Sequence, residues 1–187
     1  MSDELFLNRY RIPSARAAWH DYRNGMYFVT LCTRYRNHFF GEIVKDDTGE
    51  PQMVLSAIGE RANTCWGEIP SHFPHVETIS WVIMPNHIHG ILSINPIVGP
   101  YNSVETQNFA SLQDISYNRF GPQSKNLASV IRGFKIGVTK FARKYNLPFE
   151  WQPRFHDHII RDEDELNRIT NYIENNVAKW EEDRFYG

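Results

Sequence analysis

Two strand-like segments that are separated by only two residues constrain the fold of this chain most strongly. Residues 76–84 and 87–94 are rich in β-branched and aromatic residues, and Pro85 and Asn86 stand between them. Similar patterns predict further strands at residues 26–33, 38–44 and 52–55, and apolar residues at helical spacing predict helices at 57–69, 126–145 and 162–180. This order predicts an α+β fold in which an antiparallel sheet is covered by helices on one face.

Length and composition predict a single domain. The 187 residues, of which 41% are hydrophobic, suffice for one core and are marginal for two. A polar arm is expected at about 1–24, and a flexible insertion near the active surface at about 95–124, where Pro, Gly, Asn and Ser are frequent. No apolar run approaches the roughly 18 residues that span a membrane, and the first residues do not resemble a secretory signal, so a cytoplasmic protein is expected.

Charged residues are distributed unevenly along the chain, although the net charge is close to zero. The formal net charge of −2 argues against a protein that binds nucleic acid with its whole surface. Between residues 115 and 149, however, the chain has seven basic residues and no acidic one. Such a local basic face can bind phosphates, although a solvated helix surface has the same composition.

The most specific local motif is the pair His87 and His89. Residues two apart on a strand project from the same face, so the two imidazoles can hold one divalent ion. Two half-buried structural histidines are the alternative interpretation. A second pair, His156 and His158, has the same spacing, and spacing alone does not decide which pair binds a metal.

The last predicted helix has a second stripe beside its apolar one. Arg168, Tyr172 and Asn176 follow each other at steps of four residues and therefore share a helix face. A tyrosine at the edge of the core and a solvated arginine would give the same pattern.

Taken together, these segments resemble the single-tyrosine HUH (His-hydrophobic-His) transposases, and most closely the bacterial REP-associated tyrosine transposases. The similarity extends over nearly the whole chain and includes residues 27–30, 39–43, 82–90, 131–135, 151–152, 155–161 and 172–176. One departure is Val177, which stands where the family usually has proline.

The resemblance implies the HUH endonuclease architecture, a ferredoxin-like antiparallel sheet with the histidine pair on a central strand. It implies that Tyr172 is the nucleophile and that His87, His89 and Asn176 bind the metal. The implied cofactor is Mg²⁺ or Mn²⁺, which can polarise a phosphate without redox chemistry. The role of His156 and His158 stays open.

The implied activity is that of a DNA transposase, a site-specific single-strand endonuclease that cleaves and rejoins single-stranded hairpin DNA through a 5′-phosphotyrosine. The expected partner is a repeat-type palindrome in the bacterial nucleoid, and the resemblance does not decide between a monomer and a homodimer. The expected DNA contacts are Arg132, Lys135, Lys140 and Arg143 on the basic helix, and Arg9, Arg11 and Arg16 in the arm.

Two other functions are compatible with parts of the pattern. A domesticated relative would bind hairpin DNA without strand transfer, although the joint presence of His87, His89, Tyr172 and Asn176 argues against it. A hydrolytic zinc enzyme would use one histidine pair and water, but Asp157 is the only obvious acidic base near either pair.

Overall fold

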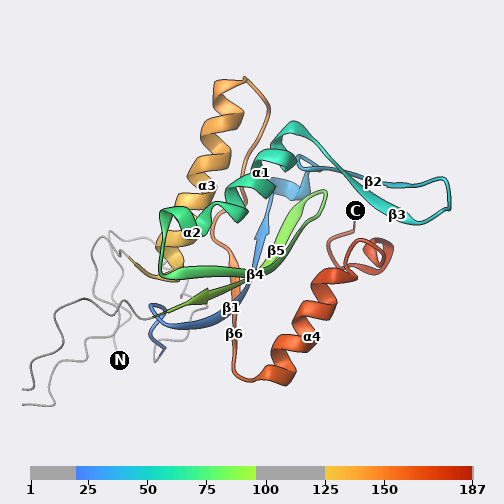
Figure 1. The fold of residues 1–187 in the computed structure, drawn as a ribbon. Coiled ribbons are helices and arrows are strands. Elements are labelled where there is room, and N and C mark those ends of the chain that lie inside the picture. The colour runs from blue at the N-terminus through green and yellow to red at the C-terminus, as the bar shows by residue number, and fades with distance from the viewer. Residues whose placement is uncertain (1–19, 96–124, 187) are drawn as a thin grey trace, which may run out of the picture.

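The computed structural model describes residues 20–95 and 125–186. Its centre is a four-stranded sheet in which every neighbouring pair of strands is antiparallel (Figure 1). The strand order is β4 (Val76–Ile83), β5 (His87–Ile94), β1 (Gly25–Cys32) and β6 (His156–Ile160). The arm residues Arg9, Arg11 and Arg16, and nearly all of the predicted insertion at 95–124, lie outside the described residues.

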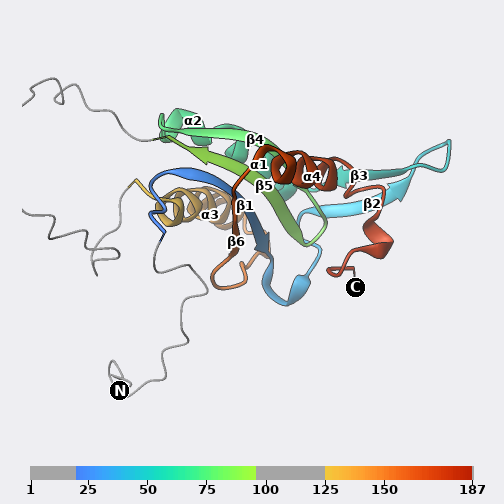
Figure 2. The ribbon, with the colours of Figure 1, turned by 90° about the horizontal axis from the view of Figure 1, so that it is seen from below.

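A separate β-hairpin consists of β2 (Gly41–Lys45) and β3 (Pro51–Leu55). It projects away from the four-stranded sheet in both views (Figures 1 and 2). Its tip is closed by Asp46, whose carboxylate accepts hydrogen bonds from the backbone of Thr48 and Glu50.

The first face of the sheet forms the main hydrophobic core. There α1 (Ala57–Gly67) and α3 (Leu127–Lys144) pack on alternate residues of the two central strands, which include Val29, Leu31, Ile88 and Leu92. The short helix α2 (Ile69–His72) follows α1 and contributes the buried Ile69. Close packing requires Gly90 in β5, because a Cβ atom there would lie 2.2 Å from the ring of Trp66.

The second face of the sheet is covered by α4 (Glu163–Glu174). Ile169 and Ile173 of this helix pack on Ile91 of β5 and Ile160 of β6, and Figure 1 shows α4 on the opposite side of the sheet from α1 and α3. The side chain of Asp162 accepts a hydrogen bond from the Glu165 amide and caps the helix. Among residues 20–95 and 125–186, no helix is both long and apolar enough to cross a membrane.

The predicted α+β class and the antiparallel sheet are confirmed, with two differences. The helices were expected on one face, but α4 packs on the other face because its apolar stripe matches the second set of alternating strand residues. The last helix was expected to reach residue 180, but it ends at Glu174, where Asn175 caps it, and a short 3₁₀ helix follows at Trp180–Glu182. Asparagine is a weak helix former, which favours an end at this point.

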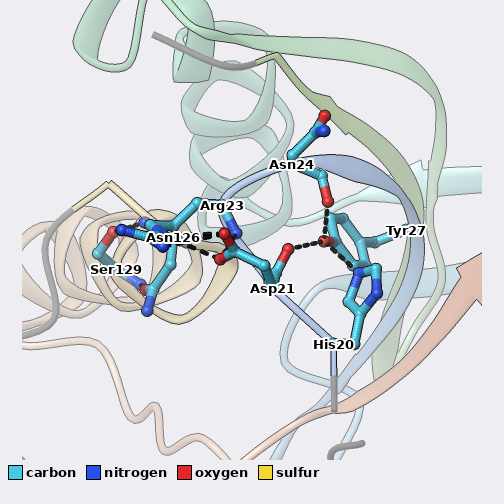
Figure 3. Close-up of polar contacts among 7 residues, drawn as sticks. All are labelled: His20, Asp21, Arg23, Asn24, Tyr27, Asn126 and Ser129. Atoms are coloured by element: carbon cyan, nitrogen blue, oxygen red, sulfur yellow. Dashed lines mark hydrogen bonds and ion pairs between the residues drawn. The ribbon is translucent and has the colours of Figure 1, made fainter. Parts of the chain in front are cut away.

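The start of β1 is tied to the start of α3. The buried Tyr27 hydroxyl donates a hydrogen bond to the carbonyl of Asn24 at 2.6 Å and lies 2.8 Å from Nε2 of His20 (Figure 3). The amide of Leu127 donates to the carbonyl of Tyr22, next to the capping box that Asn126 forms at the beginning of α3. Burial raises the pKa of Tyr27 well above its ordinary value, so this hydroxyl stays protonated and serves the fold.

Candidate metal centre and nucleophile

The histidine pair lies on a central strand, as the family resemblance implies. In β5, His87 pairs with Cys32 of β1, and His89 pairs with Thr30 of β1 and with Val82 of β4. Both imidazoles face α4, and they are 0% and 1% exposed. Their ring centroids are 4.5 Å apart.

Each histidine has a polar neighbour that orients its ring. Nδ1 of His87 donates a hydrogen bond to Oδ1 of Asn86 at 2.8 Å, because an amide oxygen can only accept. Its lone pair is therefore on Nε2. Nδ1 of His89 lies 2.9 Å from Oγ1 of Thr30, which leaves Nε2 of His89 facing the site. Such partners fix the orientation of metal-binding imidazoles in proteins.

Both imidazoles are neutral at ordinary pH. Burial, together with the nearby cations Arg184 and Arg36, lowers the pKa of His87 to about 3. Burial and the neighbouring His87 lower the pKa of His89 well below its usual range. A neutral imidazole has the free lone pair that metal coordination requires.

Two buried polar atoms at this place have no hydrogen-bond partner among the described residues. They are Nε2 of His87 and Oδ1 of Asn176. A buried acceptor without a partner costs roughly 1–3 kcal/mol, which a bound cation would offset. These are the atoms with which the two residues would ligate a metal.

An acidic residue that the sequence did not single out joins the cluster. His87, His89 and Asp183 offer potential ligand atoms that all lie within 4.8 Å of one another. Two imidazoles, an amide oxygen and a carboxylate form a mixed set of ligands that suits a divalent ion such as Mn²⁺ or Mg²⁺. The residues present therefore fit a metal.

The phenol of Tyr172 lies directly at this cluster. Its oxygen is 3.1 Å from Nε2 of His89, and it donates a hydrogen bond to Oδ2 of Asp183 at 3.3 Å. The ring contacts Phe28 edge to face. Burial, and then the charge of Asp183, raises the pKa of Tyr172. The side chain is nevertheless 43% exposed, so a substrate can reach it.

Asn176 reaches the cluster from the turn after α4 and not from the helix itself. Its amide nitrogen Nδ2 donates to Oδ2 of Asp183 at 3.3 Å. The segment that follows returns over the histidines, where the buried Phe185 ring lies 4.5 Å from the ring of His87 and its carbonyl accepts a hydrogen bond from Asn86. The C-terminal residues 176–185 thus complete one side of the site.

The second histidine pair lies at the edge of the sheet. His156 and His158 are exposed on β6, and Nε2 of His158 is 2.7 Å from Oε1 of Glu165. Within the described part of the chain, no third histidine, cysteine or carboxylate joins them within reach of one ion. The structure therefore associates the cluster of potential ligands with His87 and His89.

The predicted DNA contacts of the basic helix lie away from this cluster. Arg132, Lys140 and Arg143 are exposed on α3, which covers the opposite face of the sheet. Lys135 instead donates hydrogen bonds to the carbonyls of Gln152 and Arg154, and burial lowers its pKa to about 8. Lys135 thus connects α3 to the segment before β6.

Known proteins provide an independent comparison. No family model matches the chain. An uncharacterized protein of Haemophilus influenzae is 38% identical over 175 residues, which cover 92% of each chain. A second Haemophilus influenzae protein, named "Putative REP-associated tyrosine transposase", is 27% identical over 142 residues, which cover 76% of this chain and 70% of the relative.

A solved structure has the same fold. It is a REP-associated tyrosine transposase bound to a REP hairpin, with a TM-score of 0.54 and 19% sequence identity, and the alignment covers 96% of this chain and 74% of that one. The chain therefore belongs to the family of the first Haemophilus influenzae protein and resembles the REP-associated tyrosine transposases in sequence and in fold.

Proposed function

We propose that the protein is a DNA transposase that cleaves and rejoins single-stranded hairpin DNA through a metal-assisted 5′-phosphotyrosine. The observation that carries this proposal is the position of the Tyr172 phenol, 3.1 Å from Nε2 of His89 and beside two buried acceptors without partners. A nucleophile, neutral imidazoles and an amide oxygen meet there, and each has the role that the family resemblance implies.

In the proposed reaction the Tyr172 oxygen attacks the phosphorus of a phosphodiester. The bond between this oxygen and phosphorus forms while the bond from phosphorus to the 3′ oxygen breaks. The phenol proton passes to Asp183, which accepts its hydrogen bond, and from there to solvent. The leaving oxygen keeps the electron pair of the broken bond and takes up a proton from water. Asp183, which accepts the phenol hydrogen bond, holds the phenol oxygen toward the centre. A later attack by a 3′ hydroxyl reverses the step and returns a proton to Tyr172, so the strand can be rejoined.

His87, His89 and Asn176 would hold the divalent ion, with Asp183 beside them. When bound, such an ion polarises the phosphate and stabilises the charge on the leaving oxygen. Asn86 and Thr30 orient the two imidazoles for this task. Mn²⁺ suits the mixture of nitrogen and oxygen ligands at least as well as Mg²⁺.

The second candidate is a module that binds hairpin DNA and does not transfer strands. The similar solved structure is described as bound to a REP hairpin, and this supports hairpin binding under either candidate. The joint position of Tyr172 and the histidine pair favours the enzyme, since hairpin binding alone does not require a phenol at a cluster of neutral imidazoles.

The experiment is a covalent-trapping assay with labelled single-stranded hairpin DNA, in the presence of Mn²⁺ or EDTA, on a denaturing protein gel. We expect a metal-dependent protein–DNA band that is absent from Tyr172→Phe. Tyr145→Phe is the matched control, because Tyr145 is a similarly exposed tyrosine at the end of α3 and should leave the band unchanged. Tight binding of the hairpin without a covalent band, across several metals, would favour the binding module.

A further inference from the structure

A pocket of about 490 Å³ opens beside Tyr172. It is formed by the second half of α4 and the segment that follows, and it lies next to the metal cluster. Its volume is within the usual range for sites that bind small molecules, roughly 300–1,000 Å³. None of its lining residues was predicted as a DNA contact.

The pocket contains two cations without an acidic partner. Lys179 and Arg184 line it, and within residues 20–95 and 125–186 neither is in an ion pair. Arg168, a third lining cation, lies 3.4 Å from Glu165. The lining residues comprise three cations and two carboxylates, and one of these carboxylates, that of Asp183, already accepts hydrogen bonds from Tyr172 and Asn176. The unpaired cations favour an anionic occupant close to the nucleophile.

Besides the buried Asn176, two exposed asparagines line the pocket. Asn171 and Asn175 are exposed, one helical turn apart, and both line the same hollow as Tyr172. Asparagine is an unfavourable residue inside a helix, so helix stability does not explain the presence of Asn171 within α4. Asn175 caps the end of α4, and its Nδ2 donates a hydrogen bond to the Asn171 carbonyl at 2.7 Å. Amide groups can both donate and accept hydrogen bonds, and this is the chemistry that base edges match.

We propose that this pocket binds one nucleotide of the single-stranded DNA that flanks the scissile phosphate. Lys179 and Arg184 contact the phosphate, and Asn171 and Asn175 contact the base. The assignment rests on the proposed function, because it takes Tyr172 as the point of cleavage. It places the single-stranded flank along α4, on the opposite face of the sheet from the basic surface of α3.

Binding measured in EDTA tests the phosphate contact without cleavage. Fluorescence anisotropy would compare two labelled DNAs, a hairpin with single-stranded flanks and the same hairpin without flanks. We expect Lys179→Glu to weaken binding of the flanked hairpin about tenfold. The slope of log affinity against log salt concentration should decrease in magnitude by about one. Binding of the flankless hairpin should change little. Lys140→Glu is the matched control, since it makes the same charge change at an exposed lysine of α3 and should alter both DNAs by a similar factor.

An equal loss of affinity for both DNAs with Lys179→Glu, or no loss for either, would overturn the placement of the flank.

The base contact has its own test, in which the flanking base is varied through all four identities. We expect Asn171→Ala to reduce the preference among them to within about twofold while the salt dependence is retained. An unchanged preference would refute the base contact.

These outcomes can be distinguished from failure of the proposed reaction. A protein that binds flanks through the pocket but forms no covalent band would refute the strand-transfer activity and leave the nucleotide pocket intact. If the wild-type protein forms the covalent band and Lys179→Glu binds the flanked hairpin as tightly as the wild type does, the nucleotide pocket is refuted and the strand-transfer activity stands.

Discussion

The phenolic oxygen of Tyr172 lies 3.1 Å from Nε2 of His89, although the two residues are 83 positions apart in the chain. The contact exists because His89 is on the strand face that α4 covers, and because Ile169 and Ile173 hold α4 against that face. The packing of one helix on one sheet face thereby brings the proposed nucleophile to the proposed metal ligands.

Metal binding should stabilise the folded chain. An ion that binds the folded state alone adds about 2.7 kcal/mol at 100 times its dissociation constant. We therefore expect Mn²⁺ to raise the melting temperature of the wild-type protein and to have little effect on His87→Ala. His72→Ala, at an exposed position of α2, is the control and should respond like the wild type. A full response of His87→Ala to Mn²⁺ would place the ion elsewhere.

The hydroxyl of Thr30 should determine how tightly the metal is held. Thr30 is 2% exposed and lies 2.9 Å from Nδ1 of His89. Thr30→Val keeps the shape but removes this partner, so we expect metal affinity to fall about 10–100-fold in calorimetric titration. Thr30→Ser retains the hydroxyl and should bind nearly as the wild type does. Equal affinities in the valine and serine variants would contradict the positioning role.

The stability of the metal-free protein should fall in acid, in part through His87. Its pKa is about 3 in the folded chain, against an ordinary value near 6.5. Between these values the unfolded chain binds a proton that the folded chain does not, so the free energy of unfolding decreases as pH falls below about 6.5, by up to about 1.4 kcal/mol per unit for this group.

Urea unfolding in EDTA at about pH 7.5 and about pH 5 would measure this effect. His87→Gln cannot titrate at this position, so its loss of stability between the two conditions should be smaller than that of the wild type. Equal losses in the two proteins would show that His87 takes up its proton in the folded state as readily as in the unfolded one.

The contact between Gly90 and Trp66 should be among the least tolerant in the core. A Cβ atom at Gly90 would lie 2.2 Å from the buried ring, so Gly90→Ala should lower the free energy of unfolding by about 3 kcal/mol or more. Gly67→Ala, at the end of α1, meets nothing within 4 Å and should be neutral or stabilise the protein by about 0.5–1 kcal/mol. Chemical denaturation of the two variants checks this, and similar losses in both would refute the steric argument.

The sequence predicted those parts of the site that follow from local periodicity. The alternation of a strand places His87 and His89 on one face, and the four-residue spacing relates Tyr172 to Asn176. The end of α4 at Glu174 was not predicted, because helix periodicity continues through Val177 and Trp180 and only the cap at Asn175 shows where the helix stops.

Asp183 could not be predicted for a different reason. It follows Glu181 and Glu182, and such a run resembles a solvated acidic surface. Its place beside His87 depends on the turn of the chain after α4, which no local pattern specifies. The role of Thr30 likewise depends on the register between β1 and β5, and the separation of α3 from the site depends on which sheet face each helix covers.

The alternation along β5 has a consequence for how this protein can change over time. The main core is faced by Ile88, Gly90 and Leu92, whereas the site is faced by His87 and His89. Neighbouring positions of one strand are therefore under different selection, the first set for folding and the second for activity. Substitutions at the first set should reduce the amount of folded protein, and substitutions at the second should spare folding and remove activity. A lineage that abandoned strand transfer would therefore lose the odd-numbered histidines of this strand while its even-numbered residues stayed as they are.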